Sequence, residues 1–316
     1  MTERIKTAVI GVGHQGRWHA DKFAVLPGSE LVAVVDIDRD RCQAVAKDLG
    51  AQALTDVSDL IGEVAAVSIA TPTQTHFDIA SVLLQHGIHV LLEKPIAASV
   101  DEARRLVELA ESRDLVLQVG HLERFNPAVV ALAGHVRQPL FIESNRIAPY
   151  KPRGLDVSVV LDLMIHDIDL IHSFVRSPMT HVDAIGRSIF SKSIDVANAR
   201  IRFVNGCVAN VTSSRISLKT ERSLRIFQAD SYVSADMHNK TFTHYSNKTG
   251  GPVTGPEDVA IDKRAFESAD ALLEQGRAFL ESVAGGPPPL VSGRTALEAL
   301  ETATVIAEIV GESQQT

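Results

Sequence analysis

A glycine-rich loop between a strand and a helix constrains the fold of this chain more than any other feature. An apolar run at residues 7–10 predicts a short strand, and it leads into Gly11-Val12-Gly13-His14-Gln15-Gly16. Residues 17–26 then favour a helix, whose N-terminus attracts negative charge. The first glycine permits the tight turn, the second lets the backbone approach a pyrophosphate, and the third allows close helix packing. We therefore expect a dinucleotide to contact Gly11, Gly13, His14, Gln15 and Gly16.

An acidic residue ends the next predicted strand. Residues 31–35 form a second apolar run, and Asp36 follows it directly. A carboxylate at this position accepts hydrogen bonds from the adenosine ribose hydroxyls and repels a 2′-phosphate, which favours NAD over NADP. Arg39 leaves NADP open. The structural alternative is that Asp36 simply ends a strand in an unrelated α/β protein.

Strands and helices continue to alternate up to residue 119. Six predicted strands of this kind form a doubly wound parallel sheet, so we expect an α/β protein whose Rossmann domain spans residues 1–121. Thr71 and Pro72 end the fourth strand on the same edge as the glycine loop, and we expect them to contact the dinucleotide with His76. A helix cap at Thr73 and a solvent-facing His76 are the alternatives.

The predicted strand at residues 88–92 ends in Glu93-Lys94-Pro95. Its continuous apolar run is typical of a parallel strand buried on both faces, and a proline cannot extend the hydrogen-bond ladder. Glu93 and Lys94 should therefore lie at the carboxyl edge of the sheet, where open α/β sheets bind their ligands. We expect both to contact the cofactor. An isolated motif of this kind would more simply be a surface ion pair.

The pattern changes after Gly120, and we expect an α+β domain over residues 122–316. Several runs with strand character between residues 140 and 235 predict a mainly antiparallel open sheet. Helices are expected at 262–283 and 295–310, and the last of them could pack back on the first domain. An open sheet with one uncovered face indicates a homodimer or homotetramer.

Basic and aromatic residues cluster in this second half although the chain is acidic. A net charge of −8 argues against a nucleic-acid or anionic membrane partner. The segment Tyr150-Lys151-Pro152-Arg153 instead suits a small anionic ligand. Solvated loops are the alternative. We expect substrate contacts from Arg124, Asn126, Arg146, Tyr150 and Lys151, with phosphate groups assigned to the two arginines and the lysine.

One stripe of polar residues marks an otherwise apolar predicted helix at residues 158–174. The stripe holds Asp162, His166, Asp169 and Ser173, at spacings i, i+4, i+7 and i+11. Ionisable groups on a buried helix cost free energy unless they are paired or face a wet cavity. A catalytic acid/base, a metal site and a satisfied buried network are three possible explanations. We favour the first and expect no bound metal.

Membrane, export and disulfide signals are absent from the sequence. No apolar run approaches the about 20 residues of a spanning helix, and no signal-peptide core follows Met1. Cys42 and Cys207 are far apart and lack zinc-site or disulfide-framework spacing. We therefore expect a cytoplasmic protein without a membrane partner.

In combination these motifs resemble the glucose-fructose/inositol/MocA-type (Gfo/Idh/MocA) oxidoreductase family over nearly the whole chain. The resemblance implies NAD-dependent oxidation of a secondary alcohol. It places Lys94 and His166 beside the nicotinamide and the reacting carbinol, with Asp162 next to the substrate or the histidine. The glycine-rich lead-in of many members is replaced here by Ser158-Val159-Val160.

Residues 120–127 and 164–169 are similar to a subgroup of that family which oxidises the 3-hydroxyl group of UDP-N-acetylglucosamine. The similarity implies a nucleotide-sugar substrate and a downstream aminotransferase that supplies a diamino sugar for lipid A. Three alternatives remain: a dehydrogenase of inositol or another neutral polyol, an NAD-dependent glycosidase, and a non-catalytic NAD-sensing regulator.

Overall fold

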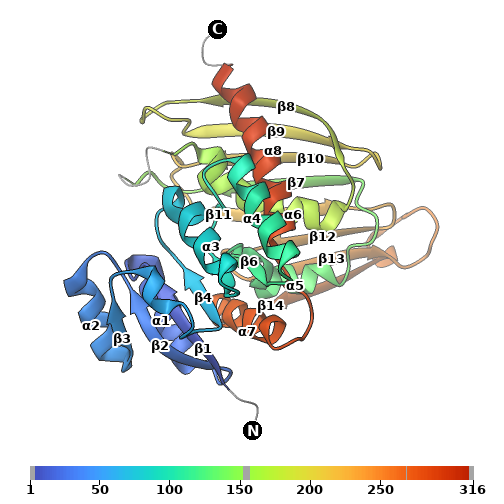
Figure 1. The fold of residues 1–316 in the computed structure, drawn as a ribbon. Coiled ribbons are helices and arrows are strands. Elements are labelled where there is room, and N and C mark those ends of the chain that lie inside the picture. The colour runs from blue at the N-terminus through green and yellow to red at the C-terminus, as the bar shows by residue number, and fades with distance from the viewer. Residues whose placement is uncertain (1–3, 152–156, 268, 313–316) are drawn as a thin grey trace. The chain divides into compact units, whose positions relative to one another are not determined.

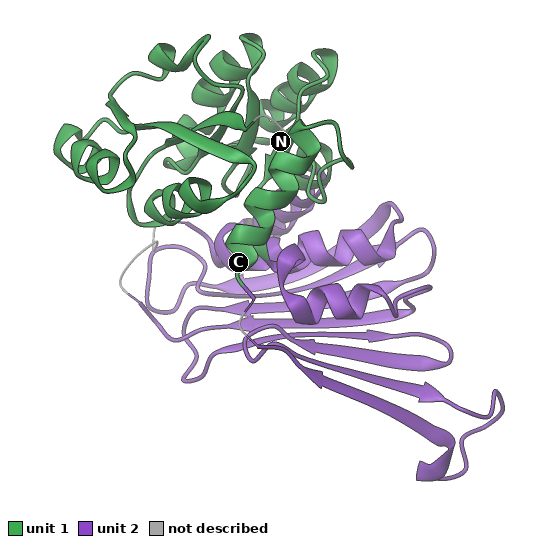
Figure 2. Ribbon diagram, turned by 90° about the horizontal axis from the view of Figure 1, so that it is seen from below, with its two compact units in different colours: residues 1–122, 270–297 green, residues 123–269, 298–316 purple. Residues whose placement is uncertain are grey.

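A computed structural model describes residues 4–151, 157–267 and 269–312. It divides the chain into two compact units, which Figure 2 distinguishes by colour. The first unit comprises residues 1–122 and 270–297, and the second comprises residues 123–269 and 298–316. The last helix, α8 (Gly293–Glu312), begins in the first unit and continues in the second.

The first unit contains a six-stranded parallel sheet in the order β3-β2-β1-β4-β5-β6 (Figure 1). This order confirms the predicted doubly wound Rossmann sheet. The strands are β1 (Ile5–Ile10), β2 (Ser29–Val35), β3 (Gln52–Leu54), β4 (Ala66–Ile69), β5 (His89–Leu92) and β6 (Leu117–Val119). The helices of this unit are α1 (His14–Val25), α2 (Arg39–Leu49), α3 (His76–Gln85), α4 (Val100–Ser112) and α7 (Ala271–Val283).

The core of this unit explains why its strands are apolar throughout. Val90, Leu91 and Leu92 of β5 are fully buried, as expected for a strand covered on both faces. The late helix α7 belongs here because Phe279 packs edge-on against Phe23 of α1, with ring centroids 6.4 Å apart.

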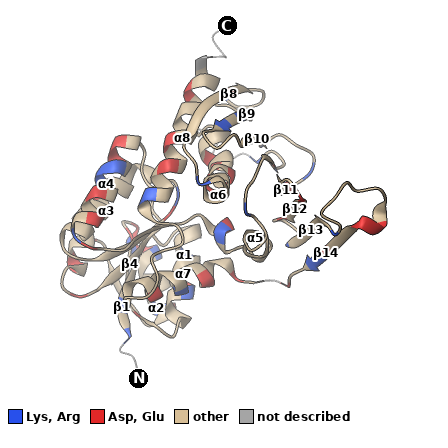
Figure 3. Ribbon diagram, turned by 90° about the vertical axis from the view of Figure 1, so that its right-hand side faces the viewer, with Lys and Arg blue, Asp and Glu red and all other residues tan. Residues whose placement is uncertain are grey.

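Helix α4 shows how local sequence fixes an element boundary. Ser99 accepts a hydrogen bond from the N–H of Glu102, and the Glu102 side chain bonds back to the N–H of Ser99, which forms a capping box. Charges of both signs then follow along the helix (Figure 3), and Arg104 pairs with Asp101 at 3.0 Å.

The second unit contains an eight-stranded sheet in the order β14-β13-β12-β11-β7-β10-β9-β8. Among the described strands of this sheet only β7 and β10 pair in parallel, which confirms the predicted mainly antiparallel sheet. The strands are β7 (Phe141–Ile147), β8 (Met179–Arg187), β9 (Val196–Phe203), β10 (Val208–Ser214), β11 (Glu221–Phe227), β12 (Ser231–Asp236), β13 (Thr241–Asn247) and β14 (Val259–Ala265). The helices are α5 (Pro127–Ala133), a π-helical turn (Val160–Met164), α6 (Ile165–Val175) and most of α8.

The helices of the second unit cover one face of this sheet (Figure 1). Buried and exposed residues alternate along β9, as expected for a strand with one covered face. The other face carries a row of ring contacts across four strands. The ring centroids of Phe141 and Phe227 lie 5.7 Å apart, those of Phe227 and Tyr232 4.9 Å, and those of Tyr232 and Tyr245 5.4 Å.

Two predicted helices differ from the structure. The helix expected at 262–283 begins only at Ala271, because residues 259–265 pair with β13 as an edge strand. Asp270 is the actual start signal, since its side chain accepts a hydrogen bond from the N–H of Leu273. The helix expected at 158–174 contains the π-helical turn, so a uniform spacing of 3.6 residues per turn is wrong for it. No helix among the described residues has the length and apolarity to cross a bilayer.

Candidate active site

The glycine loop has the geometry that pyrophosphate binding requires. Gly11 has a φ of +78°, and a Cβ added at Gly16 would lie 1.6 Å from the carbonyl oxygen of Gly11. A Cβ added at Gly13 would instead meet no atom within 4 Å. Helix α1 begins right after Gly13, so its first N–H groups, which have no partner within the helix, lie next to this loop. His14 is exposed and Gln15 is half-buried at the same helix end. The residues present therefore fit a dinucleotide.

We expect Gly13→Ala and Gly16→Ala to fail in different ways. The Gly16 variant places its new Cβ against the backbone carbonyl of Gly11, so its thermal unfolding temperature should fall together with its affinity for NAD. The Gly13 variant meets no clash in the unliganded protein, so it should unfold like the wild type and bind NAD at least about tenfold more weakly. Calorimetric titration with NAD and thermal unfolding of both variants test this. Wild-type affinity in the Gly13 variant would contradict the assignment of the space to pyrophosphate.

Asp36 lies at the carboxyl end of β2, where ribose recognition was predicted. Its carboxylate accepts hydrogen bonds from the N–H groups of Val12 and Asp38, each at 2.9 Å, and from the side chain of Arg41. Burial alone would raise the pKa of Asp36, but these bonds, that from Arg41 foremost, lower it. The Asp36 side chain is therefore an ionised carboxylate whose position these hydrogen bonds fix.

His76 is fully buried, so the alternative of a solvent-facing side chain is wrong. Its Nδ1 lies 2.9 Å from the carbonyl oxygen of Pro95, and its Nε2 lies 2.9 Å from that of Thr71. Burial lowers the pKa of His76 although both carbonyls oppose this. A neutral imidazole has one N–H and so donates to one carbonyl at a time. Since Pro72, and not Thr73, precedes the 3₁₀ turn here, the alternative of a Thr73 cap is also wrong.

Glu93 is held by a buried histidine that the sequence prediction missed. His19 Nε2 lies 3.0 Å from Glu93 Oε1, and Ser68 Oγ lies 2.7 Å from His19 Nδ1. Because a carboxylate oxygen accepts, we assign a proton to Nε2 and let Nδ1 accept from the serine hydroxyl. Gly120 completes the fit, since a Cβ there would lie 2.7 Å from Glu93 Oε1. Lys94 follows, half-buried, and its peptide bond to Pro95 is cis.

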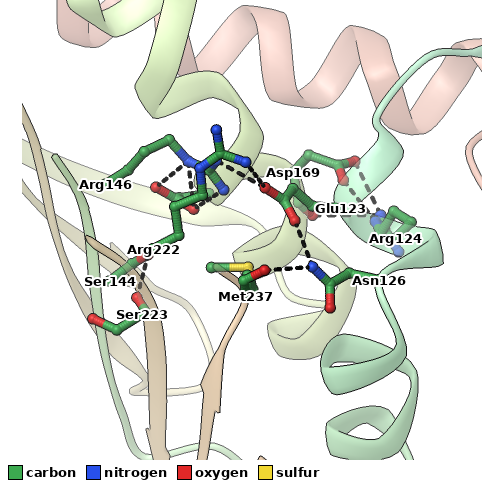
Figure 4. Close-up of polar contacts among 10 residues, drawn as sticks. Glu123, Arg124, Asn126, Ser144, Arg146, Asp169, Arg222, Ser223 and Met237 are labelled. Atoms are coloured by element: carbon green, nitrogen blue, oxygen red, sulfur yellow. Dashed lines mark hydrogen bonds and ion pairs between the residues drawn. The ribbon is translucent and has the colours of Figure 1, made fainter. Parts of the chain in front are cut away.

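A buried ionic network occupies the second unit beside α6 (Figure 4). Arg146 of β7 donates to both oxygens of Asp167 and, at 2.9 Å, to Glu123. Its side chain is 4% exposed and that of Asp167 is fully buried. Burial would lower the pKa of Arg146, but the two carboxylates raise it, whereas burial raises the pKa of Asp167 although Arg146 opposes this. This complete pairing argues against a phosphate contact for Arg146.

Arg124 and Asn126 also have partners within the protein (Figure 4). Arg124 Nε lies 2.6 Å from Asp169 Oδ2, and the side chain of Asp169 is 1% exposed. Asn126 donates to Glu123 and to the carbonyl of Met237, and its Oδ1 accepts from the first turn of α5. Both residues therefore position the segment 121–127, and a substrate contact from either stays a prediction.

Asp162 and His166 lie in the π-helical turn and in the first turn of α6, and both are half-buried. Asp169 is buried and paired with Arg124, whereas Asp162 and His166 are half-buried. Asp162 lies in the π-helical turn that precedes the α-helical residues His166, Asp169 and Ser173, so the uniform spacing assumed for the stripe does not hold at Asp162. π-helical turns are frequent at functional sites. Within the described residues no three acidic, histidine or cysteine side chains are grouped to hold a metal ion.

Tyr150 and Lys151 are exposed in the segment that follows β7. The ring of Tyr150 packs edge-on against Phe190, which is 66% exposed, with centroids 5.8 Å apart. Asp195 fixes this second aromatic residue, since its carboxylate accepts the N–H groups of residues 189–191. Burial alone would raise the pKa of Asp195, but these bonds and the Ser191 hydroxyl lower it to about 2. Pro152 and Arg153 lie outside the described residues.

A Rossmann unit with a strand-end Glu-Lys-Pro, joined to an open-sheet unit with an Asp/His helix, defines a dehydrogenase of the nicotinamide-dinucleotide class. Residues 5–121 match the oxidoreductase family with an NAD-binding Rossmann fold, and residues 128–230 match the GFO/IDH/MocA C-terminal domain. The chain belongs to the Gfo/Idh/MocA oxidoreductase family.

Among its relatives is the UDP-N-acetylglucosamine 3-dehydrogenase of Acidithiobacillus ferrooxidans, which is 40% identical over 96% of this chain and 97% of the relative. A solved structure of that enzyme superposes with a TM-score of 0.91 and 36% identity over 99% of both chains. An inositol 2-dehydrogenase of Rubrobacter xylanophilus is 37% identical over 60% of this chain and 58% of its own. A scyllo-inositol dehydrogenase from Lactobacillus casei with bound NAD(H) shares the fold, with a TM-score of 0.78 and 20% identity over 98% of both chains.

Proposed function

We propose that this protein is an NAD-dependent dehydrogenase that oxidises the 3-hydroxyl group of UDP-N-acetylglucosamine to the 3-keto sugar nucleotide. The observation that carries the proposal is the 40% identity, over nearly the full length of both chains, to a dehydrogenase named for that reaction. The half-buried Asp162 and His166 and the exposed Tyr150 and Lys151 support it, because they offer proton transfer and contacts for an anionic ligand.

In this proposal residues 1–121 bind NAD and residues 122–316 bind the substrate and pair the subunits. The loop at Gly13 holds the pyrophosphate and Asp36 faces the ribose, while Thr71, Pro72 and Glu93 border the dinucleotide. Bound NAD would supply the hydride acceptor. The open face with Phe141, Phe227 and the two tyrosines is the surface on which a homodimer or homotetramer would form.

The protein supplies proton handling and position. His166 takes the proton from the sugar hydroxyl at its imidazole nitrogen. Lys94 donates a hydrogen bond to the same oxygen and lowers the pKa of that hydroxyl, and Asp162 orients the pair or balances its charge. His19 has a different role, because it bonds to Glu93 and orients that carboxylate next to the lysine in the sequence. The keto product is a substrate for an aminotransferase on the way to a diamino sugar of lipid A, and we place these steps in the cytoplasm.

A panel of substrates tests the proposal. The protein is incubated with NAD and UDP-sugars, other nucleotide sugars, inositol or free hexoses, and each compound is followed by mass spectrometry for loss of two hydrogens. Hydroxylamine traps the ketone and draws the reaction forward. We expect the loss with UDP-N-acetylglucosamine. Loss only from inositol would replace the proposal with a polyol dehydrogenase, which the inositol 2-dehydrogenase relative favours, and release of a free aglycone would indicate a glycosidase.

A variant that removes the charge of Lys151 tests the proposed phosphate contact. If Lys151 contacts the substrate's phosphates, Lys151→Gln should raise the KM for the nucleotide sugar about tenfold or more and leave that for a neutral sugar unchanged. Lys219→Gln removes the same charge from an exposed lysine that pairs with Glu221, and it serves as the matched control. Equal effects of Lys151→Gln on both sugars would remove the phosphate contact from the proposal.

A further inference from the structure

Phe190 is an exposed aromatic residue on a turn that a buried carboxylate holds in place. Phe190 is 66% exposed and its neighbour Ile189 is 55% exposed. The fully buried Asp195 accepts the N–H groups of residues 189–191 at 2.7–2.9 Å and the Ser191 hydroxyl at 2.7 Å. A single exposed apolar side chain is ordinary, but four donors that converge on one carboxylate fix the backbone that carries it. The turn therefore presents the ring of Phe190 to solvent in a defined position.

Tyr150 forms an aromatic pair with Phe190. The two ring planes meet at 89° with centroids 5.8 Å apart, and Tyr150 is itself 41% exposed. Because the planes are perpendicular, a third flat ring that stacks on one of them turns its edge to the other, and both arrangements are favourable for π systems. The exposed cation Lys151 follows directly in the chain. A flat ring that carries an anionic group fits this combination.

The aromatic pair lies at the end of the second unit where the helix with His166 begins. The turn with Phe190 connects β8 to β9, Tyr150 follows β7, and the ends of these strands pair side by side through β10. The N–H of Val159 donates to the carbonyl of Ile194 at 2.9 Å, which bonds the same turn to the segment before the π-helical turn with Asp162. The pair is therefore joined by short chain segments to the residues that we assign to proton transfer.

We propose that Phe190 and Tyr150 form the subsite for the nucleobase of the nucleotide sugar, with the uracil ring stacked on one side chain and edge-on to the other. The inference rests on the proposed substrate. A UDP-sugar joins a flat base to a sugar through two phosphates, and the aromatic pair, Lys151 and the Asp162/His166 pair offer a partner for each part. Since every base has a π-face, the pair supplies affinity for a nucleotide and does not choose among bases.

Loss of the Phe190 ring should weaken only ligands that carry a base. Phe190→Ala should bind UDP-N-acetylglucosamine about 5- to 100-fold more weakly, the usual contribution of one stacked base, and N-acetylglucosamine 1-phosphate as the wild type does. Phe190→Tyr keeps a ring and should keep the wild-type affinity for both. Ile189→Ala removes an exposed apolar side chain from the same turn and is the matched control. Calorimetric titration with both ligands in the presence of NADH measures these affinities without turnover.

The inference is overturned if Phe190→Ala weakens both ligands equally or neither, or if Ile189→Ala has the same effect. Light scattering on the same variants tests a subunit contact, and a change of molar mass in Phe190→Ala would also overturn the inference. Phe190→Leu repeats the titration should the alanine variant unfold. A wild type that binds the nucleotide sugar but oxidises no compound of the panel would refute the proposed dehydrogenase and not the subsite. A wild type that does not bind the nucleotide sugar would refute both.

Discussion

Replacing His166 by asparagine or Lys94 by alanine should lower kcat by about 10²- to 10⁴-fold, the usual contribution of a positioned acid or base. Asparagine keeps the hydrogen bonding of the imidazole but cannot take the hydroxyl proton. Alanine at position 94 removes the donor that lowers the hydroxyl pKa. The affinity of the His166 variant for NAD should not change, because we assign that residue to the substrate. Single-turnover formation of the keto sugar, followed by mass spectrometry, gives the rates.

His172→Asn is the matched control for that experiment. This histidine lies on the same helix α6, but its Nε2 bonds to the hydroxyl of Thr302 at 2.8 Å, and burial lowers its pKa. Replacing His172 by asparagine therefore removes an imidazole from α6 without removing the group that we propose as the acceptor of the substrate's proton. Full turnover in both the His166 and the Lys94 variants would contradict the mechanism, and an equal loss in the His172 variant would show that helix packing, not proton transfer, had been measured.

The Rossmann sheet could be predicted from sequence because its signals are local. Each inner strand, such as β5, is a short run of apolar residues followed by a helix, and the glycine loop needs only six consecutive positions. The edge strand β14 lacked such a signal. It contains the charged residues Asp262, Lys263 and Arg264 in succession, so its sequence Val259–Ala265 also suits a helix, and only pairing with β13 decides the matter.

The ionic network could not be predicted, because its members are distant in the sequence. A helical projection at a constant angle does not allow for the π-helical turn that holds Asp162, and such a turn leaves no trace in composition. Whether Asp167 or Asp169 meets Arg146 depends on how α6 lies on β7, which no local pattern encodes. The sequence prediction also missed His19, which bonds to Glu93. Its position three residues after Gly16, on the buried side of α1, was a usable signal.

Arg146→Met should be the most destabilising single substitution at the site, with a loss of about 3–5 kcal/mol in the free energy of unfolding. Methionine has a similar size, so the loss reflects the fully buried Asp167, which no longer has its cation, and Glu123, which keeps only the partly exposed Arg222. Arg222→Met is the matched control. Its side chain bonds to the same Glu123 at 3.3 Å but is 48% exposed, so its removal should cost far less.

The pH dependence of the Arg146 variant separates a structural role from a substrate contact. Burial already raises the pKa of Asp167 in the folded protein, and removal of the guanidinium that opposes this raises it further. As the pH falls, a carboxylate whose pKa is raised by folding is protonated in the folded state before it is protonated in the unfolded state. Its destabilising effect on the folded protein therefore decreases as the pH falls through that pKa. The loss in free energy of unfolding caused by Arg146→Met, measured by urea unfolding, should therefore be smaller at about pH 5 than at about pH 8. A variant that unfolds like the wild type at both pH values and shows only a raised KM would restore Arg146 as a phosphate contact, because a buried ion pair cannot lose its cation without a loss of stability.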